Sequence, residues 1–150
     1  MGENKKSTEK KVKEFFDLLG ITEDFEVSET DESIEVVMAS EDPGIIIGHH
    51  GDTLDALQLI LALVLNKEAG EFKRVSLEVG DYKKNRSDYL KNLAEQTKQR
   101  VLTEGREIFL PSLKPWERRE VHMFLADDKE VLTESVGEGK DRTLVVKPLN

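Results

Sequence analysis

The sequence PGIIIGHHGDTLDALQ, residues 43–58, is the most informative stretch in the first half of this chain. Its centre is a Gly-x-x-Gly loop from Gly48 to Gly51, with an apolar run on either side. The proline–glycine pair allows one short helical turn through residues 45–47, and residues 53–66 then continue as a strongly apolar helix. Two helices therefore flank a glycine loop, where a backbone without side chains can come close to a bound chain.

The segments around this loop predict a small sheet covered by helices. Residues 7–19 place apolar side chains at helical spacing and predict a helix. Apolar and polar residues alternate in 25–28 and in 34–38, and the polar segment 30–33 between them predicts a β-hairpin. Residues 72–79 alternate in the same way and predict a third strand. The first half is therefore expected to fold as helix, strand, strand, short helix, glycine loop, helix and strand.

The second half begins with the longest predicted helix, residues 81–104. Its apolar stripe is expected to include Tyr82, Tyr89, Leu93 and Val101. Lys84, Lys91 and Lys98 recur every seven residues and so lie along one side of the helix, about 10 Å apart. That row of lysines fits either a solvated helix surface or a contact to nucleic acid.

The rest of the second half predicts a short strand at 107–110, a helix at 115–126 and closing strands at 131–133 and 143–146, with a glycine-bearing loop at 135–139 between them. Helices and strands are thus mixed throughout, which indicates the α+β class. We expect two domains, residues 1–80 and 81–150.

Composition and charge limit the classes of function. The 150 residues contain no cysteine, which excludes a disulfide framework and a thiolate zinc site. The start of the sequence is polar, no apolar run is long enough to span a membrane, and the cytoplasm is the expected location. The net charge is −9, which opposes nucleic-acid binding. The charge is uneven, however: residues 1–80 carry 8 basic and 18 acidic side chains, and residues 81–150 carry 14 and 13.

The element order of the first half, with its Gly-x-x-Gly loop, resembles the KH fold of the bacterial kind (type II). The resemblance implies that Gly48, His49, His50 and Gly51 bind RNA, because a KH loop clamps about four nucleotides. His49 and His50 stand where this family usually has Lys or Arg. Since histidine is only partly charged near neutrality, we expect a weaker or pH-sensitive clamp. A metal site at the two histidines and Asp52 is not favoured, and we expect no metal and no cofactor.

Residues 114–122, KPWERREVH, contain Arg-x-x-x-His, which is the signature of the R-three-H domain. A spacing of four places Arg118 and His122 on one face of a helix, and Arg119 adds a second guanidinium. Arginine can grip phosphate, while histidine can donate a hydrogen bond or stack on a base. These three residues are therefore candidate RNA-binding residues.

A second segment follows with the pattern Ser135-x-Gly137-x-Gly139-x-x-Arg142. It fits an ordinary hairpin turn or a backbone nest for phosphate beside the helix of Arg118. Both interpretations stay open, and Arg142 is a further candidate RNA-binding residue.

Together with GDTLDALQ at residues 51–58, these motifs resemble the Jag family, also called KhpB, over residues 8–148. The resemblance implies single-stranded RNA binding with little sequence preference, usually beside a second KH-domain protein. Its expected setting is bacterial post-transcriptional control or RNA chaperoning linked to cell elongation or division. A homodimer is a further expectation, and a membrane partner is not expected. Many family members carry an additional N-terminal domain, which the motifs do not include.

Two other classes of function can be compared with the sequence. A protein-interaction adaptor would use the apolar helix around residues 57–65, or the acidic first half, to bind a partner protein. An RNA-processing enzyme would use His122 as a general acid or base, but the sequence offers no nucleophile or carboxylate pair to act with it. We therefore expect no catalysis. Trp116 is expected to be a core or capping residue rather than a stacking platform.

Overall fold

The computed structural model describes residues 2–67 and 69–149, and the chain divides into two compact units, Met1–Tyr82 and Lys83–Asn150. Each unit has helices, a three-stranded sheet and a hydrophobic core of its own, so the predicted α+β class is confirmed.

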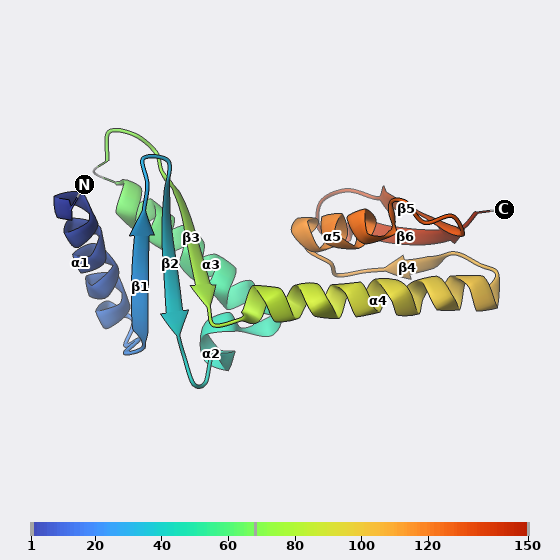
Figure 1. The fold of residues 1–150 in the computed structure, drawn as a ribbon, viewed down its shortest axis with the longest axis horizontal. Helices are drawn as coiled ribbons and strands as arrows, with labels where there is room; N and C mark the ends of the chain where they lie inside the picture. Colours follow the sequence, from blue (N-terminus) through green and yellow to red (C-terminus); the bar gives the residue numbers. More distant parts are fainter. Residues whose placement is uncertain (1, 68, 150) are drawn as a thin grey trace. The chain divides into compact units, whose positions relative to one another are not determined.

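Unit 1 follows the predicted order (Figure 1). Its elements are α1 (Gly2–Leu18), β1 (Asp24–Glu29), β2 (Ser33–Ala39), α2 (Gly44–Ile47), a 3-10 turn (His49–Gly51), α3 (Asp52–Asn66) and β3 (Arg74–Val79). The sheet order is β1-β2-β3, with β1 antiparallel and β3 parallel to β2. The parallel pair requires a crossover, which α2 and α3 provide.

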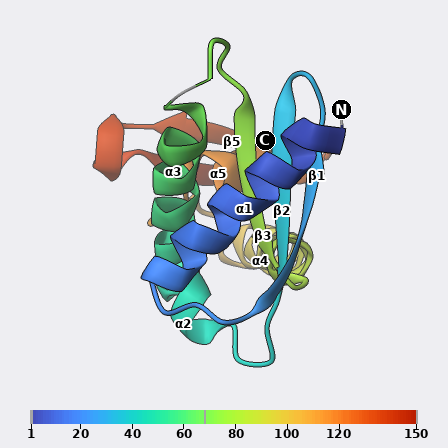
Figure 2. The same ribbon diagram turned by 90° about the vertical axis from the view of Figure 1, so that its left-hand side faces the viewer.

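The core of unit 1 lies between the sheet and the two long helices, α1 and α3 (Figure 2). In β2, Ile34, Val36 and Met38 are buried, while the residues between them are exposed. This alternation follows from the two-residue period of a strand with one face on the core. Phe16 of α1 and Leu61 of α3 cover that face and are almost completely buried.

The third strand begins later than predicted, at Arg74 instead of Phe72. The Asn66 amide at the end of α3 accepts a 2.8 Å bond from the Lys73 N–H and donates a 2.9 Å bond to the Lys73 carbonyl. Because both backbone groups of Lys73 are held by a side chain, they do not join the sheet. Phe72 is 76% exposed.

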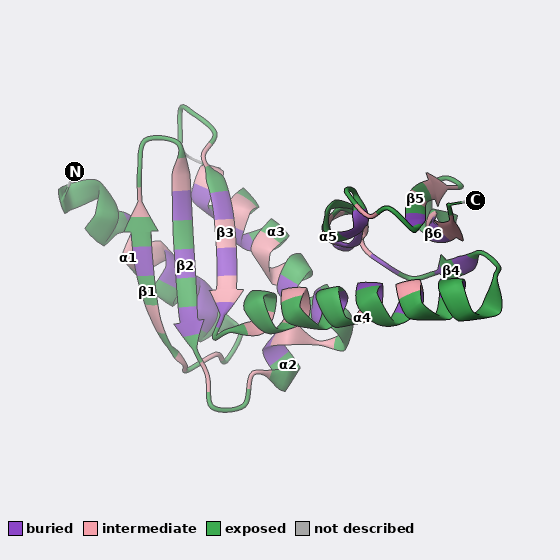
Figure 3. Ribbon diagram, turned by 45° about the vertical axis from the view of Figure 1, so that its right-hand side comes forward, coloured by how far each residue is buried: buried purple, intermediate pink, exposed green. Residues whose placement is uncertain are grey.

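Unit 2 contains nearly all of α4 (Tyr82–Glu104), then β4 (Ile108–Leu110), α5 (Pro115–Leu125), β5 (Val131–Val136), a 3-10 turn (Gly139–Asp141) and β6 (Thr143–Pro148). The sheet order is β4-β6-β5, and both pairings are antiparallel. One stripe of α4 and one face of α5 pack on this sheet, and Figure 3 shows the buried segments of both helices.

Two predictions for the second half were wrong in detail. Tyr89 does not belong to the buried stripe of α4: it is 52% exposed, and Leu90 takes the core position beside it. Ser135 does not lie in a loop, because β5 continues to Val136 and Ser135 pairs with Leu144. The loop between the last two strands is accordingly shorter than the sequence indicates.

Candidate nucleic-acid interface

The two glycines of the loop are fixed by their surroundings. Gly48 has φ 70°, and a β-carbon there would lie 2.1 Å from the hydroxyl oxygen of Thr53. Gly51 has φ 81°, and a β-carbon there would lie 2.9 Å from the Tyr82 hydroxyl oxygen. Side chains rarely adopt such positive φ values. Both positions therefore favour glycine for conformation, and Gly48 needs it for space as well.

The two residues between these glycines present their rings to solvent. The rings of His49 and His50 are stacked, with centroids 4.0 Å apart and planes inclined by 25°. His50 has φ 50° and ψ 30°, so the backbone turns sharply there and α3 starts afresh after Gly51. The exposed ring pair thus stands at the N-terminal end of α3, where backbone N–H groups and the helix dipole favour an anion.

Carboxylates lie close to the same loop. Asp52 and Asp55 occupy the first turn of α3 and are exposed. They lower the positive potential that the helix end would otherwise offer to phosphate. In the parts of the chain that the structure describes, no group of three or more His, Cys, Asp or Glu residues could hold a metal ion.

The motif residues of α5 have different environments. The Arg118 guanidinium is half-buried and donates a 2.7 Å bond from Nη1 to the carbonyl of Leu113, just before the helix. Arg119, one residue later, is exposed. His122 is exposed, and its Nδ1 shares a hydrogen bond with the Thr133 hydroxyl of β5. Arg118 therefore supports the entry to α5, whereas Arg119 and His122 are accessible to a ligand.

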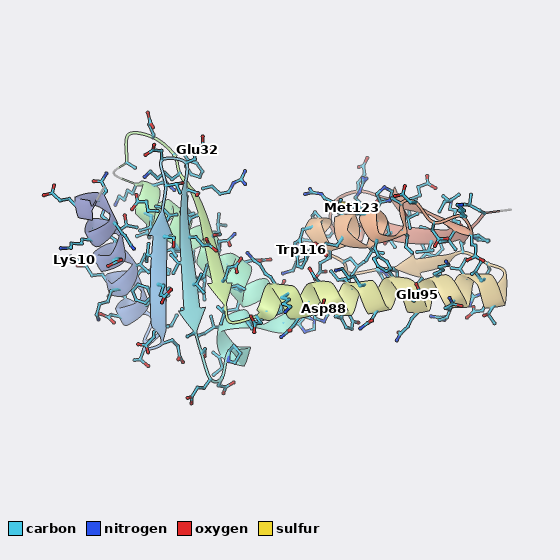
Figure 4. The ribbon with its side chains drawn as sticks, in the orientation of Figure 1. Lys10, Glu32, Asp88, Glu95, Trp116 and Met123 are labelled. Carbon is cyan, nitrogen blue, oxygen red and sulfur yellow. The ribbon has the colours of Figure 1, made fainter. Side chains whose placement is uncertain are left out.

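A buried ion pair that the sequence analysis did not anticipate holds the start of α5. Arg86 of α4 donates a 2.7 Å bond from Nε to Oε1 of Glu117, whose side chain is completely buried. The other carboxylate oxygen of Glu117 accepts a 3.0 Å bond from the Lys114 N–H. The available signal was a glutamate three residues after the N-cap, the usual place for a capping carboxylate. Trp116, labelled in Figure 4, packs against the core, as predicted.

The glycine loop after β5 folds back on itself. Gly137 has φ 87°, and a β-carbon there would lie 2.9 Å from the Asp141 carbonyl oxygen. Arg142 is exposed and donates a 3.3 Å bond from Nη1 to the carbonyl of Gly137, and Gly139 begins the 3-10 turn with φ 57°. Gly137, Gly139 and Arg142 thus form one small loop, while Ser135 lies in the strand before it.

The lysine row of α4 is not uniform. Lys98 bridges the Asp128 and Glu130 carboxylates at 2.7 and 2.9 Å, whereas Lys84 and Lys91 are exposed. The hydrogen bond from Lys98 holds the pKa of Asp128 below its ordinary value of 3.8, and the pKa of Lys98 is raised by the same bond. Lys98 is thus a structural residue that ties α4 to the turn after α5.

Comparisons with known proteins agree with these two units. The family model for the KhpA/KhpB KH domain matches residues 9–79, and that for the R-three-H domain matches residues 88–148. A protein of Clostridium symbiosum named RNA-binding protein KhpB is 34% identical over 137 residues, which cover 90% of this chain and 62% of that protein. The chain belongs to the KhpB family.

Further KhpB proteins show the same relationship. The Bacillus subtilis protein is 30% identical over 125 residues, covering 82% of this chain and 60% of the relative. The Lactiplantibacillus plantarum protein is 34% identical over 128 residues, covering 85% of this chain and 40% of the relative. The chain therefore spans between 40% and 62% of the length of these three KhpB proteins. The predicted type II KH domain followed by an R-three-H domain is confirmed.

The two domains of this chain offer different surfaces. The KH domain carries its candidate residues on one exposed loop in an acidic surrounding, and the R-three-H domain carries them on α5 and on the loop before β6. Within residues 2–67 and 69–149, no helix is both long and apolar enough to cross a membrane.

Proposed function

We propose that this chain binds single-stranded RNA in the bacterial cytoplasm, as a post-transcriptional regulator or RNA chaperone linked to cell elongation or division. The observation that carries the proposal is the loop of Gly48 to Gly51. Both glycines have a positive φ, a β-carbon at Gly48 would collide with Thr53, and the two rings between the glycines are exposed at a helix N-terminus. Such a loop lets a sugar-phosphate backbone approach closely, as in other KH domains.

The R-three-H domain supplies the second contact in this proposal. Its sequence from residue 81 onward is nearly neutral, with 14 basic and 13 acidic side chains, and so repels phosphate less than the first half does. Arg119 and His122 are exposed on α5. Arg142, together with the left-handed Gly137 and Gly139, offers a further place for phosphate. Contacts of this kind bind the backbone of RNA and show little base preference.

The test is fluorescence anisotropy with a labelled, unstructured, uridine-rich RNA. The double substitution His49→Asp/His50→Asp places two carboxylates on the exposed loop and is expected to weaken binding at least about tenfold. The control, Thr22→Asp/Ala69→Asp, adds the same charge at other exposed positions of unit 1 and is expected to have a much smaller effect. Equal losses in both variants would show that net charge, and not the loop, governs binding.

A second candidate function is binding of another KH-domain protein, or of a second copy of this chain, through α3. Leu59 and Leu63 are 63% and 62% exposed, and Ile60 and Val64 lie beside them on the same side of the helix. A continuous exposed apolar stripe on one helix is typical of a protein interface. Sedimentation of the wild-type chain and of Leu63→Glu tests this function: a dimer that the substitution dissociates supports it, and two monomers contradict a homodimer.

A further inference from the structure

A groove runs between α1 and β1 in unit 1. It encloses about 690 Å³ and is lined by Lys5, Lys6, Glu9, Lys10 and Lys13 of α1 and by residues 25–28 of β1, which include Glu26. Lys10, labelled in Figure 4, projects from α1. A second hollow of about 220 Å³ shares Lys13 and Phe25 with the groove and extends it toward the start of β1.

The strand that lines this groove is an open edge of the sheet. In the sheet order β1-β2-β3, and within the residues that the structure describes, β1 pairs only with β2. The 2.8 Å bond from the Thr30 N–H to the Ser33 carbonyl makes Thr30 and Ser33 a hydrogen-bonded pair and so fixes which of the following pairs are hydrogen-bonded. Because bonded and non-bonded pairs alternate, the backbone N–H and carbonyl groups of Phe25 and Val27 point away from β2. Met38 is the partner of Phe25, and its carbonyl is bonded toward β3 and not toward β1, as expected for a non-bonded pair of β1 and β2.

The groove is positive although its domain is acidic. Four of the eight basic side chains among residues 1–80 line it. Lys13 pairs with Asp17 at 2.8 Å and Lys5 lies 3.9 Å from Glu9, whereas Lys6 and Lys10 make no ion pair with any carboxylate in the described ranges. Two exposed cations therefore stand beside a strand with unpaired backbone groups.

We propose that this groove binds an acidic, extended segment of a partner protein, which joins the sheet beside β1 while its carboxylates face Lys6 and Lys10. A peptide matches the alternating donors and acceptors of an edge strand. A nucleic-acid backbone lacks the regular N–H donors that the carbonyls of Phe25 and Val27 require. A second copy of the chain, paired edge to edge, would bring its own lysines close to Lys6 and Lys10, and these like charges would repel one another. The proposal does not depend on the KH loop.

The probe is a capped, fluorescein-labelled peptide of eight residues that alternates glutamate and valine. Its binding to the full chain is measured by anisotropy, and amide hydrogen exchange is followed by NMR. We expect exchange at Phe25 and Val27 to slow when the peptide binds. Lys6→Glu/Lys10→Glu is expected to weaken binding about tenfold. Lys84→Glu/Lys91→Glu, with the same charge change on exposed lysines of α4, is expected to leave the affinity within about twofold.

Two controls separate peptide pairing from simple charge attraction. The same peptide with every backbone nitrogen methylated, so that neither of its edges can donate a hydrogen bond, is expected to lose binding. If the methylated peptide binds as well as the parent peptide, or if the parent peptide itself does not bind, the lysines only shield the edge and the proposal is wrong. If a uridine-rich RNA protects the amides of Phe25 and Val27 and displaces the peptide, the groove belongs to RNA and the proposal is likewise overturned.

Discussion

Arg86 and Glu117 form a 2.7 Å hydrogen-bonded ion pair whose carboxylate is completely shielded from solvent. The pair joins the first turns of α4 to the first turn of α5, directly before the motif residues Arg118 and Arg119. The Arg86 guanidinium also lies 4.8 Å from the centroid of the Tyr89 ring. Because Glu117 also accepts the Lys114 N–H, a single buried carboxylate fixes both the helix start and its distance from α4.

Removing one partner of this pair should destabilise the R-three-H domain strongly. Arg86→Met leaves the Glu117 carboxylate buried without its cation, which is expected to cost about 3 kcal/mol in the free energy of unfolding. The double variant Arg86→Met/Glu117→Leu should recover a large part of that loss, since no unpaired charge then stays buried. Urea unfolding of both variants and of the control Glu120→Ala checks this. Similar stability of wild type and Arg86→Met would contradict a structural role for the pair.

Substituting the first loop glycine should damage the KH domain. Gly48→Ala combines a positive φ with a β-carbon 2.1 Å from the Thr53 hydroxyl oxygen, so α3 must shift. We expect a loss of roughly 2 kcal/mol or more in the free energy of unfolding. Gly70→Ala is the matched control, because a β-carbon at Gly70 meets no atom within 4 Å. Thermal unfolding of both variants measures the difference, and equal melting temperatures would contradict the steric reasoning.

The ion pair of Lys98 and Asp128 predicts a pH dependence of stability. The pKa of Asp128 is lowered in the folded protein, chiefly by the hydrogen bond from Lys98. A carboxyl group whose pKa is lowered by folding stabilises the folded state at pH values above its pKa in the unfolded chain. This contribution is lost as the pH falls through the pKa of the group in the folded protein. Lys98→Met should therefore reduce stability at pH 7 and make it depend less on pH below about 4. Urea unfolding at pH 7, 4 and 2.5 tests this. Parallel pH curves for both proteins would refute it.

Most of the elements could be predicted from the sequence because their signals are local. The alternation in β2 and the apolar runs around Gly48 depend only on neighbouring residues, and the structure confirms them. The start of β3 could not be predicted, because the Asn66 side chain captures the backbone of Lys73. That contact becomes visible only when α3 and β3 are placed.

The candidate site follows the same division between local and tertiary signals. The loop glycines and Arg119 could be named from motifs, but the motif does not show that Arg118 is bonded to the Leu113 carbonyl. The burial of Glu117 depends on Arg86, a residue 31 positions earlier in the chain. Charged residues at helical spacing therefore do not show by themselves which ones are free to bind a ligand.

RNA binding should strengthen as the pH falls from about 7.5 to 6, because histidine gains positive charge across this range. The motive is the exposed, stacked pair of His49 and His50 in the glycine loop. Anisotropy measurements across this range are compared with the same series on His49→Gln/His50→Gln, which replaces both imidazoles by uncharged polar side chains. If both proteins show the same slope, other groups respond to pH.

The two adjacent arginines of α5 should differ in what they contribute. Arg119 is exposed, so Arg119→Ala is expected to weaken binding of all RNA sequences about equally and to leave the melting temperature unchanged. The negative slope of log affinity against log salt should become shallower by about 0.7. Arg118 is half-buried and bonded to the Leu113 carbonyl, so Arg118→Ala is expected to lower the melting temperature as well. Arg142→Ala, which loses a bond to the Gly137 carbonyl, should resemble Arg119→Ala if its guanidinium also meets phosphate. Affinity at several salt concentrations, measured together with thermal unfolding, separates these contributions. An unaltered salt slope for Arg119→Ala would remove that side chain from the RNA contact.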